Sequence, residues 1–236
     1  MNPLKPLICA VIGGITLSAT VIAAAAPLAG MNQSAEPAVD GVKITKMPVD
    51  VQHRTFDARR PPPEMPRLKP PEAALCAAEF LSSASVSGQA VQTDAMRAKL
   101  TINRVEVTVH LNITVWLPPN PPRRIVEHEE GHRQIAEYFY DNADVIAKRL
   151  AEPYIGKVIE ISGSDVRNAL AAVLNETGEE ITEAYKSQIP VERAEVRYDA
   201  ITDHGRNDIP VPVAVAQAIR ETALASSQPT SPAARK

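Results

Sequence analysis

Hydrophobic and polar residues alternate strictly over residues 104–117, and this is the clearest secondary-structure pattern in the chain. The apolar positions of the alternation are Val105, Val107, Val109, Leu111, Ile113, Val115 and Leu117. A period of two predicts a β-strand with one face in the core and the other in water. We therefore expect His110 and Trp116, which stand on the second face, to be exposed, and Pro118 and the prolines that follow to end the strand.

The pattern changes to a helical period directly after these prolines. The positions that recur three or four residues apart are Ile125, His128, His132, Ile135, Phe139, Ala143, Ile146 and Leu150. This spacing predicts an amphipathic helix, which we expect to end near Glu152 and Pro153. Both histidines fall on the apolar stripe of the helix, so we expect them to be buried.

The sequence before residue 104 gives weaker signals. Short apolar alternations around residues 42–44 and 49–51 predict two strands. The proline-rich residues 59–71 cannot form a helix or a β-ladder, and we expect an extended linker or a strap along the surface. Residues 72–81 are rich in alanine and favour a short helix.

Beyond residue 153 the pattern predicts one short strand and further helices. The strand covers residues 158–161, and Ser164 is the expected cap of a helix that Gly178 interrupts. Another helix is expected from Glu179 towards Ile201, with Pro190 kinking or breaking it. Residues 226–236 are rich in Ser, Pro and Ala, a composition typical of disorder.

The first residues resemble a targeting segment. Lys5 precedes an uncharged apolar stretch from Leu7 to Ala26 that ends in four alanines, which predicts a secretory signal peptide over residues 1–26. An uncleaved membrane anchor is the alternative, because the stretch is nearly long enough to span a bilayer. Cleavage predicts a periplasmic or secreted protein, with Cys76 as the only cysteine left and no disulfide within the mature chain.

Composition divides the rest of the chain and excludes one class of partner. We expect an extended, proline-rich segment over residues 27–71, one domain over residues 72–210, and a C-terminal helix with a tail over residues 211–236. The net charge is −3 and no large basic block is present, so nucleic-acid binding has no electrostatic basis. After signal cleavage we expect no stable membrane insertion.

The predicted helix carries the sequence His128-Glu129-Glu130-Gly131-His132, the H-E-x-x-H pattern of zinc hydrolases. Residues four apart lie one above the other on a helix, so both imidazoles can reach one metal ion. Glu129 then lies beside the open coordination position. A glutamate there can take a proton from the zinc-bound water and return it to the leaving amine.

A catalytic zinc ion normally has three protein ligands, and the motif supplies two. The extended H-E-x-x-H-x-x-G-x-x-H form is absent, because Ile135 and Tyr138 replace its glycine and its third histidine. Two residues further along the chain are candidates for the third ligand. Glu176 follows an asparagine on a second predicted helix, and His204 precedes Gly205.

Three segments together resemble a bacterial secreted family known as domain of unknown function 922. They are residues 116–119 (Trp-Leu-Pro-Pro), the motif at 128–132, and the later Tyr198-Asp199-x-x-Thr202-x-His204-Gly205. The resemblance covers residues 100–206, and its members are predicted zinc-dependent proteases. It implies that His204 is the third zinc ligand and that Tyr198, Asp199 and Thr202 support the site.

These observations predict an α+β, zincin-like fold in which an antiparallel or mixed sheet packs on the motif helix, with further helices towards the C-terminus. The expected activity is that of a secreted zinc peptidase acting on peptides or proteins. His128, His132 and His204 hold Zn²⁺, and Glu129 is the catalytic base. Tyr198 either stabilises the oxyanion of the tetrahedral intermediate or packs in the core.

Two rival functions share these residues. One is a cell-envelope protein that keeps a zincin-like fold and serves only as a binding or structural module. Loss of the glutamate base would mark that class, and Glu129 is present. The other is a zinc amidase that uses the same chemistry on the peptides of peptidoglycan.

Overall fold

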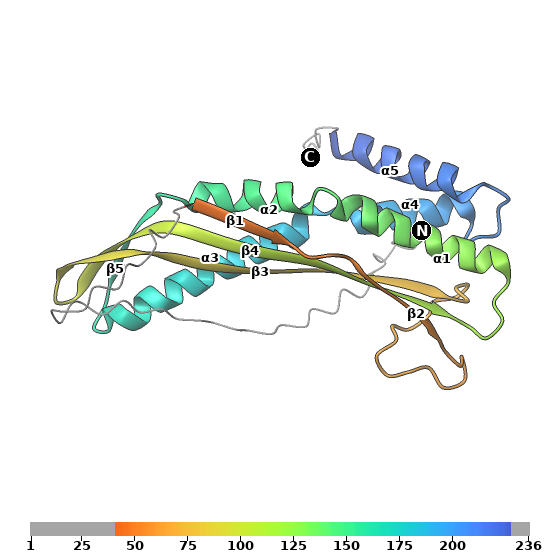
Figure 1. Ribbon diagram of the computed structural model, residues 1–236, viewed down its shortest axis with the longest axis horizontal. Helices are drawn as coiled ribbons and strands as arrows, with labels where there is room; N and C mark the ends of the chain where they lie inside the picture. The colour runs from red at the N-terminus through yellow and green to blue at the C-terminus, as the bar shows by residue number, and fades with distance from the viewer. Residues whose placement is uncertain (1–40, 228–236) are drawn as a thin grey trace, which may run out of the picture.

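The computed structural model describes residues 41–227, which contain five β-strands and five α-helices (Figure 1). The predicted α+β composition is confirmed. The signal peptide or anchor predicted for residues 1–26, and most of the predicted disordered tail, lie outside the described residues. Within residues 41–227 no helix combines the length and the apolar character needed to cross a bilayer.

One long strand, β4 (Arg97–Leu117), is the centre of the sheet. It pairs antiparallel along its length with β3 (Leu75–Asp94). Three short strands follow one another along its other edge: β5 (Val158–Ser162) is antiparallel to β4, whereas β1 (Gly41–Lys46) and β2 (Asp50–Thr55) are parallel to it. The result is a long, narrow sheet (Figure 1). The predicted strands at 42–44, 49–51, 104–117 and 158–161 are all confirmed.

The helix predicted for residues 72–81 is wrong, because most of this segment belongs to β3. Ala77 and Ala78 pair with Thr114 and Ile113 of β4. Alanine favours a helix only weakly, and tertiary context overrides such a preference. A full-length ladder with the most regular strand of the chain outweighs it here.

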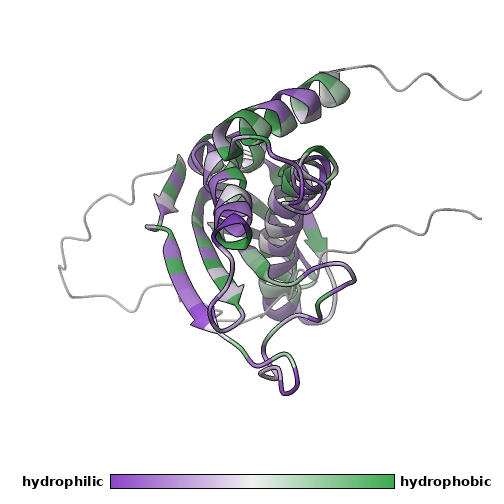
Figure 2. Cartoon of the chain, turned by 90° about the vertical axis from the view of Figure 1, so that its right-hand side faces the viewer, coloured by the Kyte–Doolittle hydropathy of each residue, from purple (hydrophilic) through white to green (hydrophobic). Residues whose placement is uncertain are grey.

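Helices cover one face of this sheet. The predicted motif helix is in fact two, α1 (Arg123–Tyr140) and α2 (Ala143–Ala151), separated at Asp141 and Asn142, and a short 3₁₀ turn, η1 (Glu152–Tyr154), follows. The apolar face of β4, from Val105 to Val115, shares one core with α1, α2 and α3 (Val166–Gln188). Viewed along the long axis, the helices gather beside the strands (Figure 2).

The opposite face of β4 is covered at one end. Phe56, Met65 and Trp116 form a small buried cluster, and Trp116 is only 3 % exposed. The expectation that Trp116 is exposed is therefore wrong. Residues 56–71, called the strap below, fold over the end of the sheet and shield it (the loop beside β2 in Figure 1). His110, further along the same face, is half-buried.

Two local predictions for α3 are also corrected. Asp165, not Ser164, is the N-cap, and its Oδ1 accepts a hydrogen bond of 3.0 Å from the backbone N–H of Asn168. Gly178 does not interrupt the helix. It lies against β3, where a Cβ atom would be 2.6 Å from the carbonyl oxygen of Ala84, so the glycine permits close packing of helix and strand.

The last two helices pack on α1. Pro190 ends α3 and precedes α4 (Val191–Thr202), as the sequence predicts, and α5 (Val211–Ser227) follows. Both helices pack on α1 through a second core of Ile135, Ala194, Tyr198, Ala214, Val215 and Ala218. This core fixes α4 beside the histidines of α1.

Candidate metal centre

The motif helix α1 presents its H-E-x-x-H residues to the interior. His128, Glu129 and His132 are 7 %, 5 % and 9 % exposed. The two histidines are therefore buried, as their place on the apolar stripe predicts. Buried imidazoles need polar partners, because an unpaired polar group loses its hydrogen bonds to water.

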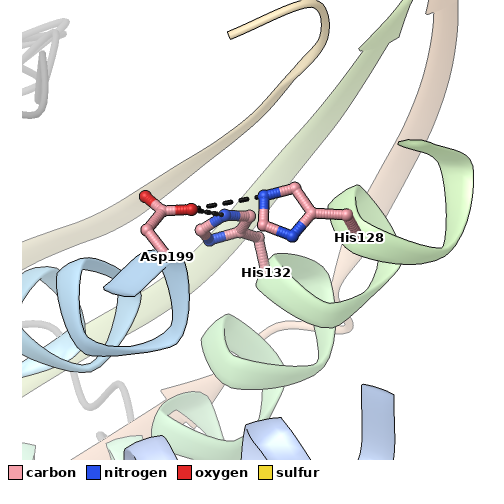
Figure 3. Close-up of side chains that lie close together, drawn as sticks. All are labelled: His128, His132 and Asp199. Atoms are coloured by element: carbon pink, nitrogen blue, oxygen red, sulfur yellow. Dashed lines mark hydrogen bonds and ion pairs between the residues drawn. The ribbon is translucent and has the colours of Figure 1, made fainter. Parts of the chain in front are cut away.

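Asp199, on α4, provides that partner. Its Oδ1 lies 3.2 Å from Nε2 of His128 and 3.1 Å from Nε2 of His132. Figure 3 shows the two rings, one helical turn apart on α1, pointing at this single oxygen. The three ligand atoms all lie within 4.8 Å of one another, a grouping that can hold a metal ion.

The donor set and its spacing fit zinc. Two imidazole nitrogens and one carboxylate oxygen are ligands that catalytic zinc sites use. Ligand atoms about 2.0–2.1 Å from a tetrahedral ion are about 3.3–3.4 Å apart, and the two measured N–O distances are close to this value. The three ligand atoms together lie within 4.8 Å of one another, so the two imidazoles would have to approach each other to bind one tetrahedral ion.

Thr202 orients the first imidazole from its far side. Its Oγ1 lies 3.4 Å from Nδ1 of His128 and donates a hydrogen bond of 2.8 Å to the carbonyl oxygen of Tyr198. If an ion bound Nε2 of His128, the proton of the ring would lie on Nδ1 and could be donated to Oγ1. Such an outer contact fixes the tautomer and the orientation of a ligating histidine.

Tyr198 locks α4 against α1. Its ring stacks on His128 at a centroid distance of 5.1 Å and meets His132 edge-on at 4.9 Å, and its hydroxyl donates to the carbonyl oxygen of His128. A Cβ atom at position 131 would lie 2.0 Å from that hydroxyl, so this contact requires Gly131. Tyr198 is fully buried and does not line the cleft, which favours the packing role over the oxyanion role.

His204 lies behind Asp199, at the edge of this site. It stands with Asp203 and Gly205 in a left-handed turn at the end of α4, where all three have positive φ. Its Nδ1 is 3.4 Å from Oδ1 of Asp199, and within residues 41–227 it is not part of the group of three side chains that could hold a metal ion. Asp199, rather than His204, therefore stands with the two histidines in the group that could hold a metal ion.

Glu176, the other predicted candidate, is not brought to the site. It is exposed on α3 beside Gly178, which packs on Ala84 of β3. The site lies at Cys76, eight residues earlier on that strand, which corresponds to ~26 Å at ~3.3 Å per residue.

A cleft of about 500 Å³ opens over the histidines and Glu129. The strap and the start of β3 form one wall, through residues 66–76. Residues of α4 and of the turn after it form another, and α1 is the floor. The cleft therefore gives a ligand access to Asp199 and to the side chain of Glu129.

Comparison with protein-family models, with curated proteins and with solved structures found no match in any of the three. The resemblance to the family named above therefore stays a prediction, and the function has to be argued from the site.

Burial and charge perturb the acids and bases of the site strongly. Desolvation raises the pKa of Glu129 to about 7, against the opposing charge of His132 and a hydrogen bond from the backbone N–H of Cys76. Burial also favours the neutral form of Asp199, but hydrogen bonds from His128 and His132 outweigh it and hold its pKa well below the usual range. Asp199 is therefore ionised.

The two histidines are affected in opposite directions. Burial first, and then the charges of His132 and His204, lower the pKa of His128 by more than Asp199 raises it. For His132 burial also lowers the pKa, but the hydrogen bond and charge of Asp199, with Glu195 and Glu129, raise it to about 9. The positive charge of the His132 imidazolium thus balances the negative charge of the Asp199 carboxylate. A bound cation would take the place of that positive charge.

Sequence reasoning placed Asp199 only as a support and overlooked its role as a candidate ligand. Asp199 lies 67 positions from His132, so no local spacing connects them. The signal for Asp199 was its place in the segment Tyr198-Asp199-x-x-Thr202-x-His204-Gly205, which carries the family resemblance.

Proposed function

We propose that the protein is a zinc-dependent peptidase with a zincin-like active site, in which a glutamate base acts next to a His-His-Asp metal centre. The observation that carries the proposal is the convergence of both Nε2 atoms of the H-E-x-x-H helix on Asp199, with buried Glu129 beside them in an open cleft. The substrate is a peptide or protein, and residues 1–26 favour the periplasm or the exterior of the cell.

His128, His132 and Asp199 are the residues that would hold the ion. When bound there, zinc supplies Lewis acidity that makes water a stronger nucleophile and polarises the scissile carbonyl. The neighbouring residues keep the ligands in place. Thr202 holds the tautomer of His128, and the ring of Tyr198 supports both imidazoles.

Glu129 is the proposed general base. It lies next to His128 on the floor of the cleft, and the backbone N–H of Cys76 contacts its carboxylate. That contact orients the carboxylate towards the cleft. From this position it can take up the proton of an attacking water and pass it to the leaving amine, as general acid–base catalysis requires.

The proposal assigns the third ligand to Asp199 and an outer position to His204. Nδ1 of His204 lies 3.4 Å from Oδ1 of Asp199, so its ring borders the carboxylate and limits how it can turn. Outer contacts to a ligating side chain raise metal affinity without adding a bond to the metal.

Metal content and hydrolysis of the parent protein and of Glu129→Gln test the proposal together. We expect about one zinc per chain in both proteins, and peptide hydrolysis only in the parent, with a loss of at least ~10²-fold in the variant. A parent that holds no metal contradicts the proposal. A parent that holds zinc and hydrolyses no peptide supports instead the non-catalytic envelope protein.

A further inference from the structure

Basic side chains surround the cleft over the metal centre. The cleft is lined by Arg67 and Lys69 from the strap, Arg124 from the first turn of α1, and Arg206 from the turn after α4. Arg206 donates to Asp203, at 2.6 Å from Oδ1, so its charge is neutralised within its own turn. Arg67 and Arg124 make no ion pair and no side-chain hydrogen bond in the part of the chain that the structure describes.

Arg124 stands where a helix disfavours a positive charge. The first turn of α1 contains no acidic residue, although acids suit the positive end of the helix dipole. The adjacent Arg123 is compensated by Glu127, at 2.7 Å. Arg124 has no such partner among residues 41–227, and it lies four residues before His128, one turn away on the same face of the helix. Helix stability does not explain an arginine at this position.

Arg67 is held at the cleft by its neighbours. Met65 is buried against Trp116, and Leu68 packs on the same cluster. The backbone on both sides of Arg67 is therefore fixed, while its side chain is exposed at the cleft. The strap therefore fixes the point from which the side chain of Arg67 extends, and only the side chain has to become ordered when a ligand binds.

Two acidic residues, Glu72 and Glu195, also line the cleft. Oε2 of Glu72 accepts a hydrogen bond of 2.7 Å from the backbone N–H of Lys69. Glu195 acts on the metal centre, where its charge raises the pKa of His132. The outer cleft therefore offers two guanidinium groups, which match carboxylates in charge and in bidentate geometry.

We propose that Arg67 and Arg124 bind a carboxylate of the substrate, so that the protein selects acidic peptides. The inference rests on the proposed function, because it names the substrate class of that site. Two sources can supply the carboxylate: an Asp or Glu side chain near the scissile bond, or the free C-terminus of a peptide bound close to its end.

Binding rather than turnover is the primary test. Zinc-loaded Glu129→Gln is titrated by calorimetry with three short peptides of one sequence. The first has a central Asp and an amidated C-terminus, the second has Asn and an amidated C-terminus, and the third has Asn and a free C-terminus. We expect at least one carboxylate peptide to bind ~10-fold or more tightly than the neutral one, as for hydrogen bonds to charged groups. The member of the series that binds best identifies the source.

Matched substitutions test whether the two arginines cause the preference for carboxylate peptides. Arg67→Gln and Arg124→Gln, each made in the Glu129→Gln background, should each reduce the preference several-fold. Arg59→Gln on the same strap and Arg123→Gln on the same helical turn remove the same charge without touching the cleft, and they should leave it unchanged. Because the contact is electrostatic and exposed, the preference should also fall as salt is raised.

Equal binding of the three peptides, or no measurable binding of either carboxylate peptide, overturns the inference. If the parent nevertheless hydrolyses peptides and Glu129→Gln does not, the proposed peptidase stands without this specificity. Selective binding without any hydrolysis by the parent has the opposite meaning: carboxylate recognition is supported and the peptidase is not.

Discussion

At the scale of single residues, the site depends on the fit between Gly131 and Tyr198. The tyrosine ring supports both histidines, and its hydroxyl occupies the space that any side chain at position 131 would need. The glycine is therefore required by packing, although an alanine is normally ~1 kcal/mol better inside a helix.

Gly131→Ala should lower the free energy of unfolding by ~1–3 kcal/mol, the usual effect of overpacking, in spite of the gain in helix propensity. Urea denaturation followed by circular dichroism measures the change. In the background of Tyr198→Ala the same substitution should cost less, because the hydroxyl oxygen and Cζ, which would lie 2.0 and 2.4 Å from the new Cβ, are both gone, and the two changes are then non-additive. A more stable Gly131→Ala protein would contradict this packing.

The residues that share one element were predictable, and the residue that comes from another element was not. Helical spacing alone placed His128, Glu129 and His132 on a buried face. Asp199 reaches them only because α4 packs on α1 through a separate core, and that contact has no local pattern in the sequence. The resemblance named Asp199 as a support but favoured His204 as the ligand.

At the scale of elements, the long strand β4 determines the fate of weaker segments. The alternation of β4 predicted a strand. The sequence of β3 did not, because its alanines and serines have little preference for the β-conformation. Pairing with β4 makes this segment a strand. Trp116 shows a second limit of sequence patterns. Alternation indicates which residues share a face of the strand, but it does not indicate that a loop about 50 residues earlier covers that face.

Start signals of helices can be tested at the same scale. Asp165→Ala should destabilise the protein by ~1 kcal/mol, because Oδ1 of Asp165 is the acceptor for a free N–H of the first turn of α3. Ser164→Ala is the matched control and should change stability by less than ~0.5 kcal/mol. Thermal or urea unfolding of the two variants measures the difference. A larger loss of stability in Ser164→Ala would contradict Asp165 as the N-cap and support Ser164, the residue that the sequence favours.

The strap offers a second test among the elements. Met65 is 7 % exposed and anchors the strap on Trp116, so Met65→Ala should loosen residues 56–71 and speed trypsin cleavage after Arg67. Met47, which is 40 % exposed, provides the control Met47→Ala. Cleavage at an unchanged rate in Met65→Ala would mean that this contact does not hold the strap.

At the scale of the whole molecule, the candidate metal centre joins two parts of the structure. α1 belongs to the core of the sheet, whereas α4 and α5 form a separate layer, and His128, His132 and Asp199 lie at their contact. An ion bound there would hold α4 on α1 in addition to the packing of Tyr198. The overall class, the central strand and the helical cover were predictable, but this assembly was not.

Zinc should therefore stabilise the folded protein as a whole. At a free concentration 100 times the dissociation constant, a ligand specific for the folded state adds ~2.7 kcal/mol. The melting temperature of the apoprotein should rise on addition of zinc and fall again with a chelator. The increment should be lost in Asp199→Ala. A melting temperature that is insensitive to zinc in the parent would exclude a metal that joins the two layers.

The most direct test of the central claim is the zinc affinity of three proteins, measured by competition with a chelator of known affinity. The account predicts tight binding by the parent, a loss of well over ~10²-fold in Asp199→Ala because a ligand is removed, and a smaller loss, of ~10-fold, in His204→Ala because an outer contact is removed. An Asp199→Ala protein that binds zinc as tightly as the parent, or a parent that binds none, would contradict the His128, His132 and Asp199 centre.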